Sequence, residues 1–316
     1  MKRASALILV IITINCVAQD VHFSQFNRSS LLLNPALVGF QNSDYKAVIQ
    51  RRSQWESVSV PFNTFCFSVE KKDVFPTQSF GGQFLNDIAG DSHFKTTGVN
   101  LAYSKRVSFT SNNLFSLGVG FGFFQRSVIF DNLIFNDFES LPNINFTFFD
   151  LGFGAVNVYQ ITQNTVIQSG VAIYHINNPR QSLIDNKDVV LNEKINLHTS
   201  LHFELNNKVS IHPSALFSIQ DRDKEFLLAI NFDYLIQENQ NTILKSGFAQ
   251  RFNDAIIFYS GLKIKNISCL LSYDVNTSSL AAASDNKGGF EFSVTYNWNV
   301  SKNIKIKKEE KCPQYL

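Results

Sequence analysis

The sequence has little charge, and it lacks the long apolar runs of helical membrane proteins. Only 17% of its 316 residues are charged, with 28 Lys and Arg against 26 Asp and Glu. Because there is no basic excess for contacts to phosphates, we expect no nucleic-acid partner. No apolar run of about 18 residues lies in the body of the chain, which argues against transmembrane helices. Low charge and a hydrophobic content of 44% also argue against disorder.

Cysteine and methionine are scarce as well. The chain has four Cys and one Met, and its Cys residues show no close spacing. The sequence therefore contains no zinc-binding pattern, and we expect neither a metal nor another cofactor. Cys66 and Cys269 lie inside strand-like runs, where a lone Cys is usually a small buried side chain. A disulfide involving Cys312 could form in an oxidising compartment, but the spacing does not indicate its partner.

The first 18 residues have the features of a secretory signal peptide. A basic start is followed by an apolar stretch over residues 4–14 and by small residues just before Gln19. This pattern predicts export and cleavage before Gln19. The alternative is a lipoprotein signal with Cys16 as the lipidated residue, and Asn15 in front of that Cys is unfavourable for it.

From residue 45 onward, large apolar residues alternate with small or polar ones. The run over residues 114–124 alternates apolar side chains with Ser and Gly, and the runs over 195–205 and 290–298 alternate in the same way. Successive side chains of a strand point to opposite faces, so each run has one apolar face and one small or polar face. The chain is therefore predicted to be all-β.

Strand length and polarity separate two all-β architectures. Many runs have about ten residues, which is long for a soluble sandwich but suits tilted strands that cross a membrane. Their polar faces carry Ser, Asn, Gln, Gly and His, which fits a crowded lumen better than a soluble surface. Aromatic residues near strand ends fit membrane-interface girdles: Tyr45, Trp55, Phe124, Tyr174, Tyr273 and Trp298. We predict a transmembrane antiparallel β-barrel in lipid, with a soluble exported β-sandwich as the alternative.

The alternating runs number about fourteen and lie within residues 45–300. An even number is the rule for bacterial barrels. Longer polar connections at 125–145, 175–193 and 275–288 alternate with short turns, so one barrel end is expected to carry long loops. Both chain termini would then lie at the other, periplasmic end, where residues 301–316 form a charged tail.

Residues 19–44 are too apolar for a free tail. They contain Phe23 and Phe26 and a further apolar run over residues 31–39. Within that run, Pro35 forces the residue before it out of the helical conformation. We predict a short N-terminal plug-like segment that packs within the periplasmic mouth of the barrel.

No motif in the chain predicts catalysis. The glycines from Gly118 to Gly122 lie inside a continuing alternation rather than between a strand and a helix, so they are interpreted as small residues on the inward face of a curved sheet. His198 and His202 share one face of a strand but lie about 13 Å apart, too far to chelate a metal together. The sequence has no G-x-S-x-G elbow and no Ser, His and Asp set that local sequence ties together, so we expect no enzyme.

Four motifs, taken in order, resemble those of a known family. They are an N-P-A-x-x-G opening, an R-S-Q-W sequence, a paired closing signature and a Cys-Pro terminus. The residues that carry them are Asn34, Pro35, Ala36, Gly39, Arg52, Gln54, Trp55, Tyr273, Asp274, Asn276, Glu291 and Cys312. In these motifs the chain resembles the PorP/SprF family of type IX secretion proteins.

The resemblance implies an outer-membrane barrel without enzymatic activity in a Bacteroidetes-type cell envelope. It also implies work with the type IX secretion machinery, either in secreting or anchoring large surface cargo such as gliding adhesins, or as a structural member of the periplasmic ring complex. No catalytic or cofactor-binding residues come with it. A barrel of about fourteen strands has a narrow lumen, which favours an adaptor or anchor over a translocation pore. A passive channel for small solutes is the alternative.

Overall fold

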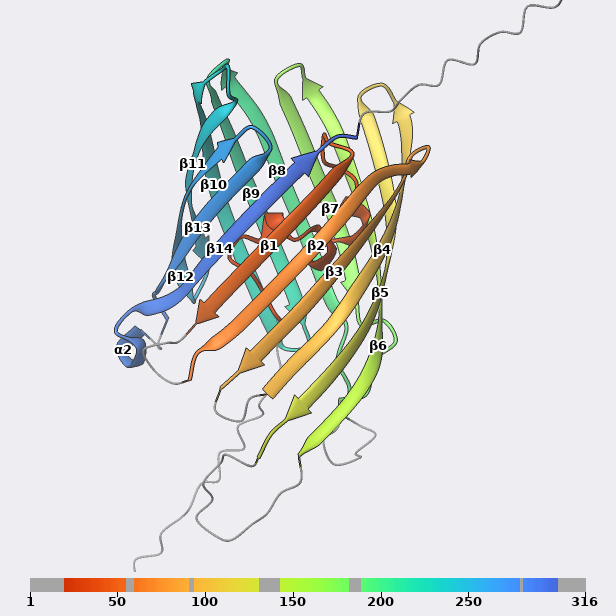
Figure 1. Cartoon of the computed structure of the whole chain (residues 1–316), viewed down its shortest axis with the longest axis vertical. Helices are drawn as coiled ribbons and strands as arrows, with labels where there is room; N and C mark the ends of the chain where they lie inside the picture. The colour runs from red at the N-terminus through yellow and green to blue at the C-terminus, as the bar shows by residue number, and fades with distance from the viewer. Residues whose placement is uncertain are drawn as a thin grey trace, which may run out of the picture.

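The computed structural model describes residues 20–54, 60–90, 94–130, 143–181, 189–278 and 281–300. Fourteen antiparallel strands form a closed barrel in which each strand pairs with its neighbours in sequence and β1 pairs with β14 (Figure 1). The predicted fold class and strand number are therefore confirmed. Within the described ranges, no helix is long and apolar enough to cross a membrane.

The strands are tilted and of unequal length. Their bounds are β1 Tyr45–Gln54, β2 Phe62–Phe75, β3 Gln78–Ala89, β4 Phe94–Thr110, β5 Asn113–Val128, β6 Ile144–Thr162, β7 Thr165–Tyr174, β8 Lys194–Asn206, β9 Val209–Gln220, β10 Asp223–Gln237, β11 Thr242–Arg251, β12 Ala255–Ile264, β13 Ile267–Asn276 and β14 Lys287–Trp298. Four short helical turns complete the described elements: η1 Phe26–Arg28, α1 Ser30–Leu33, η2 Pro35–Leu37 and α2 Ala281–Ser284.

Strands β4, β5 and β6 are longer than their alternation predicts, with 17, 16 and 19 residues. In β5 the apolar alternation of outward residues stops at Gln125, and in β6 it begins only at Phe149, after the outward Asn145 and Thr147. Backbone pairing continues beyond these points, because Gln125 pairs with Thr147 and Ser127 with Asn145. The side-chain pattern therefore reports the part of a strand that lies in lipid, and the hydrogen-bonded ladder extends beyond it.

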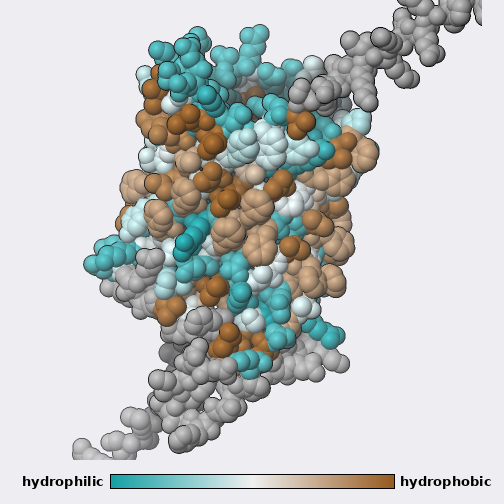
Figure 2. All heavy atoms as spheres, in the orientation of Figure 1, coloured by the Kyte–Doolittle hydropathy of each residue, from teal (hydrophilic) through white to brown (hydrophobic). Residues whose placement is uncertain are grey.

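The outward positions of the strands form an apolar surface. Leu101, Phe121 and Phe153 are 62%, 59% and 50% exposed, and similar side chains follow the other strands. Figure 2 shows hydrophobic residues over the barrel wall and hydrophilic residues gathered toward its ends. Apolar area on this scale is unfavourable in water and is the expected surface of a barrel in a bilayer.

The two strand cysteines occupy opposite faces. Cys66 is buried, as predicted, but Cys269 is exposed, so its predicted burial is wrong. In β13 the buried positions alternate with outward ones, and Cys269 is in phase with Leu271 and Tyr273, which point outward. The phase of the strand decides which face a residue takes, and residue type alone does not show it. Cys312 lies outside the described residues.

Residues 20–44, called the N-terminal segment below, run through the barrel interior. Odd-numbered strands finish at one end of the barrel, which carries the long connections after β5, β7 and β13 and is called the long-loop end below. Even-numbered strands finish at the opposite end, where all connections are short, and this is called the turn end. The backbone of Asp20 bonds to Gln220, the last residue of β9, at the long-loop end. The segment reaches the turn end at the start of β1. It thus spans the lumen, whereas the sequence predicted packing in the periplasmic mouth with both termini on that side.

Candidate functional site

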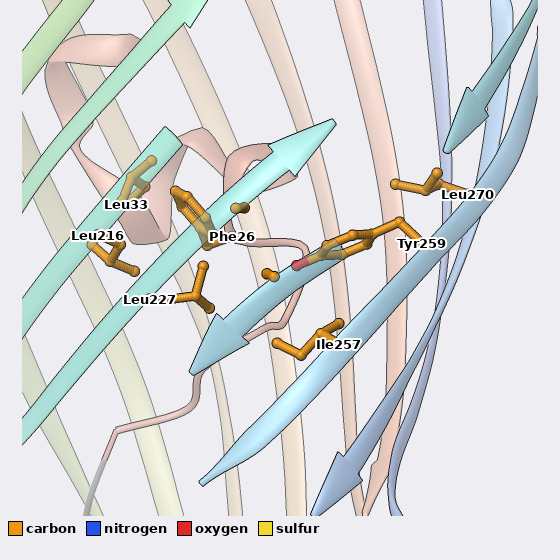
Figure 3. Close-up of a cluster of buried hydrophobic side chains, with 9 residues drawn as sticks. Phe26, Leu33, Leu216, Leu227, Ile257, Tyr259 and Leu270 are labelled. Carbon is orange, nitrogen blue, oxygen red and sulfur yellow. The ribbon is translucent and has the colours of Figure 1, made fainter. Parts of the chain in front are cut away.

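Apolar side chains of the N-terminal segment pack against one side of the lumen wall. Phe26 and Leu33 are buried in a cluster contributed by β9, β10, β11, β12 and β13 (Figure 3). The wall residues of this cluster are Leu216, Leu227, Ala229, Ala249, Ile257, Tyr259 and Leu270. Full burial of a Phe or Leu side chain stabilises by about 1.5–3 kcal/mol, so this contact favours the docked segment.

Asn34 fixes the path of the segment on the opposite side of the lumen. Its amide nitrogen donates to the carbonyl of Ala155 in β6 at 3.1 Å and to that of Val171 in β7 at 3.0 Å. Its Oδ1 accepts from the backbone N–H of Ala36 at 2.9 Å, which caps the turn η2 that Pro35 begins. Both the nitrogen and the oxygen of this buried amide therefore have hydrogen-bond partners, and the side chain connects the N-P-A motif to two strands.

Glycines on the lumen wall make room for this motif. A Cβ on Gly118 in β5 would lie 2.3 Å from the backbone nitrogen of Ala36, and one on Gly154 in β6 would lie 1.9 Å from Asn34 Oδ1. Any side chain at these positions would displace the segment. The inward position predicted for the β5 glycines agrees with the structure, and the reason for it is close packing of the segment against the backbone.

Gly39 directs the segment toward the turn end. Its φ is +85°, a left-handed conformation that residues with a side chain rarely adopt. Its N–H donates to Glu70 Oε2 at 3.2 Å, and its carbonyl accepts from Arg106 Nη1. Ser104, on the same strand β4 as Arg106, donates to the carbonyl of Val38 at 2.6 Å. The last glycine of the N-P-A-x-x-G motif therefore serves a turn that its backbone conformation requires.

A buried ion network holds the first residues of the segment near the long-loop end. Asp274 Oδ2 in β13 accepts from Arg52 Nη2 in β1 at 2.9 Å and from Arg251 Nη1 in β11 at 3.1 Å. The hydroxyl of Ser24 donates to the same carboxylate at 2.7 Å. Arg52 also donates to the carbonyl of His22 at 3.1 Å. These charges are buried, so their mutual pairing is what makes burial tolerable.

Glu291 in β14 binds the backbone of the same residues. Its carboxylate accepts from the N–H of Ser24 at 2.7 Å and from the N–H of Gln25 at 3.2 Å. Gln50 in β1 donates to it at 3.2 Å. Gln25 in turn donates to Ser272 at 3.1 Å and accepts from Ser293. The segment is therefore bonded to the first and the last strands of the barrel, where the closing seam lies.

The structure thus brings Arg52, Asp274 and Glu291 together around one stretch of chain. Gln54 joins them, because its amide oxygen, turned toward the guanidinium, lies 2.6 Å from Arg52 Nη2. The other motif residues lie apart. Tyr273 is 42% exposed on the outward face, and Asn276 donates to Ser284 at 3.0 Å in the connection before β14. Trp55 and Cys312 lie outside the described residues.

His175 forms a second anchor, at the very start of the described segment. Its Nδ1 is 2.8 Å from Asp150, and its Nε2 is 2.6 Å from Asp20. Burial alone would lower the pKa of His175, but the two carboxylates outweigh burial and raise it to about 9. Burial would raise the pKa of Asp20, and His175 and Lys194 outweigh it and hold that pKa well below its usual value. The pair is therefore ionised at neutral pH.

Sequence reasoning missed several residues of this site. Ser24 and Gln25 were recognised only as part of an apolar stretch, and Arg251, Tyr259 and His175 were not singled out. Tyr259 donates to the carbonyl of Ser24 at 2.8 Å. Inward-facing charged residues in the alternation were an available signal, since charge in a lumen calls for a partner.

Two small cavities lie between the segment and the wall. One cavity of about 40 Å³ lies between the segment and strands β8 to β10, with His22, Phe26 and Leu216 among its lining residues. Another of about 10 Å³ lies next to Pro35 and Tyr174. Such volumes hold one or a few water molecules. The described segment therefore packs closely against the wall at these two places, as a plug would.

Comparison with protein families gives the chain its context. Residues 15–296 match the model described as "Type IX secretion system membrane protein PorP/SprF". The chain belongs to the PorP/SprF family. It is therefore a membrane component of the type IX secretion system, and its closed barrel agrees with an outer-membrane location. Among curated proteins, none matches the sequence.

Solved structures show the same fold for this PorP/SprF protein. The toluene transporter TbuX of Ralstonia pickettii has a TM-score of 0.55 at 10% identity, over 85% of this chain and 93% of that one. The toluene transporter TodX of Pseudomonas putida has a TM-score of 0.53 at 11% identity, over 86% and 93% of the two chains. At these identities the likeness shows the barrel fold alone.

Proposed function

We propose that this PorP/SprF protein is a non-enzymatic adaptor or anchor, which helps secrete large cargo proteins such as gliding adhesins or attach them to the cell surface. The observation that supports this most is the N-terminal segment lying through the lumen. A lumen filled by buried ion pairs and packed apolar side chains leaves no room for a passing polypeptide. Cargo would instead bind outside the lumen, on the connections of the long-loop end.

The two barrel ends suit different partners. Long connections follow β5, β7 and β13 at the long-loop end, which faces the cell exterior in bacterial barrels. We assign cargo to that end. The turn end, where β14 finishes, would face the periplasm and the ring and translocon components of the secretion machinery. Residues 301–316 would serve as a charged contact there, and residues 1–18 as the signal peptide removed on export.

The test is to shorten the connections after β5, β7 and β13 and measure cargo retention on intact cells. The variant should still show a heat-modifiable barrel on a gel, and cargo should be lost from the surface. As a matched control, the turn Glu238–Asn241 at the opposite end is replaced by a two-residue turn, which should leave retention unchanged. If the loop variant forms a folded barrel and still retains all of its cargo, the proposal is wrong.

A passive channel for small solutes is the second candidate. It is favoured by the shared fold with TbuX and TodX, which are named as toluene transporters. For this chain, such a role would require the N-terminal segment to leave the lumen. An adaptor with a filled lumen is nearly silent in a planar bilayer, and a channel conducts.

A further inference from the structure

Two histidines face each other on the lumen wall, away from the N-terminal plug contacts. His202 lies in β8 and His212 in β9, and the pairing of Ser200 with Ser214 and of Phe203 with Ile211 places them opposite each other. Both are on the lumen face, in phase with His198, which contacts the segment residue Asn34 at 3.1 Å. Their ring centroids are 4.7 Å apart, and their Nδ1 atoms are 3.0 Å apart.

The other nitrogen of each ring faces a carboxylate. His202 Nε2 is 3.3 Å from Glu204 Oε1 in a hydrogen bond, and His212 Nε2 is 3.5 Å from Asp233 Oδ2, an ion-pair distance without hydrogen-bond geometry. A carboxylate favours the tautomer with the proton on the nitrogen that faces it. Each Nδ1 can then present a lone pair toward the other ring. With a proton on one Nδ1, the 3.0 Å contact is a hydrogen bond between the rings; with both Nδ1 atoms deprotonated, the same two atoms can converge on a cation.

We propose that His202 and His212 bind one divalent transition-metal ion through their Nδ1 atoms. Metal–nitrogen bonds of about 2.05 Å to atoms 3.0 Å apart give an N–metal–N angle of roughly 94°. This angle suits tetragonal Cu²⁺ or Ni²⁺ directly, and a few tenths of an ångström of opening suits tetrahedral Zn²⁺. Neutral imidazole oriented by a carboxylate is the usual ligand for all three ions.

The site is a two-residue chelate with open positions. Among the residues that the structure describes, no group of three or more His, Cys, Asp or Glu side chains is arranged to hold a metal. The remaining ligands must be water or groups of a partner, and the His202 side chain is 42% exposed for such contact. Asp233 also pairs with Lys245, which reduces the negative charge available to the metal. The expected affinity is therefore lower than that of a closed structural site.

The sequence alone could not reveal this pair. In the sequence, His198 and His202 stand four residues apart, but the extended backbone of a strand keeps two such side chains far from each other. The residue that His202 does contact is His212, ten residues further along the chain on the next strand. Only the register of β8 against β9 brings the two rings together.

The experiment uses the full chain, purified in detergent through a tag without histidines and titrated with Zn²⁺ or Cu²⁺. One ion should bind, and the Cu²⁺ electron paramagnetic resonance spectrum should show two nitrogen ligands. His202→Asn or His212→Asn should weaken binding at least tenfold, and Glu204→Gln by about tenfold through loss of ring orientation. Ser210→Ala, on the same face of β9, is the matched control and should bind as the wild type does.

Heat-modifiable migration on a gel establishes that each variant is folded before it is titrated. The proposal is overturned if the wild type binds no tighter than the folded double variant, or if the Cu²⁺ spectrum shows fewer than two nitrogens. Either outcome would mean that a shared proton, rather than a metal, joins the two rings.

Discussion

At the scale of single residues, contact between the N-P-A motif and the lumen wall depends on the absence of side chains. Gly118 and Gly154 leave space that Asn34 and Ala36 occupy, and Asn34 uses its whole amide to hold that position. Since interiors pack at high density, one added methyl group in such a contact must move the backbone.

Gly118→Ala should loosen the N-terminal segment, because its Cβ would lie 2.3 Å from the Ala36 nitrogen. We expect a loss of about 1–3 kcal/mol of unfolding free energy from overpacking, together with faster trypsin cleavage at Arg28. Gly120→Ala is the matched control, since its Cβ would meet Pro35 at an ordinary 3.7 Å. Equal cleavage rates in the two variants would contradict this view of the wall.

Residue-level prediction from sequence succeeded in part. The motif around Arg52, Asp274 and Glu291 could be singled out by its resemblance to a family, but nothing in the sequence showed that these three side chains meet at Ser24 and Gln25. The closing register of β1 against β14 creates that meeting, and contacts across the whole chain are not visible in local periodicity.

At the scale of elements, the N-terminal segment is bound to the barrel wall near both of its ends. Near the long-loop end it is held by ionic contacts, and near the turn end by Gly39 and its neighbours. The apolar alternation predicted correctly the parts of the strands that carry the apolar outward surface. It did not predict the parts of β5 and β6 that continue beyond this surface. The path of the N-terminal segment could not be predicted from the sequence, because contacts with the barrel wall determine its turns and its own sequence has no periodicity that would.

The anchor at His175 should weaken as pH rises. Because the pKa of His175 is raised from its usual 6.5 to about 9, its contribution to stability is full below pH 6.5 and is lost as pH rises through 9. The lowered pKa of Asp20 keeps its contribution present above about pH 4, with loss only in strong acid. Hydrogen exchange of residues 20–24 should therefore accelerate between pH 7 and 10.

The charged groups that face this anchor come from several elements. Asp150 lies in β6 and Lys194 in β8, and Arg126 of β5 also acts on Asp20. His175→Asn is the comparison variant, since Asn tolerates the φ of +58° at this position but cannot ionise. In this variant, hydrogen exchange of residues 20–24 should already be fast at pH 7. After division by the intrinsic chemical exchange rate, it should not change with pH. Matching profiles for variant and wild type would rule out His175 as the anchor.

At the scale of the whole molecule, the barrel has a defined direction. The N-terminal segment begins among the long connections, and β14 ends on the opposite side, so the two ends of the described chain lie on opposite faces of the membrane. This arrangement follows from fourteen strands plus one internal crossing by the segment. A barrel with a plug confined to the periplasmic mouth would have both ends on one side.

An epitope inserted between Gln19 and Asp20 should be detected by antibody on intact cells, because long connections face outward in bacterial barrels. The same epitope after Leu316 should be detected only after the outer membrane is opened. Labelling of the second epitope but not of the first on intact cells would mean that the barrel has the reverse orientation.

The central claim is that the N-terminal segment closes the lumen, and current through single purified molecules in a planar bilayer tests it most directly. Insertion is first established from the heat-modifiable migration of the same sample. We expect the wild type to be nearly silent, while a variant lacking residues 20–42 shows discrete open steps. Steady open-channel current from the wild type would contradict the account and favour a solute channel.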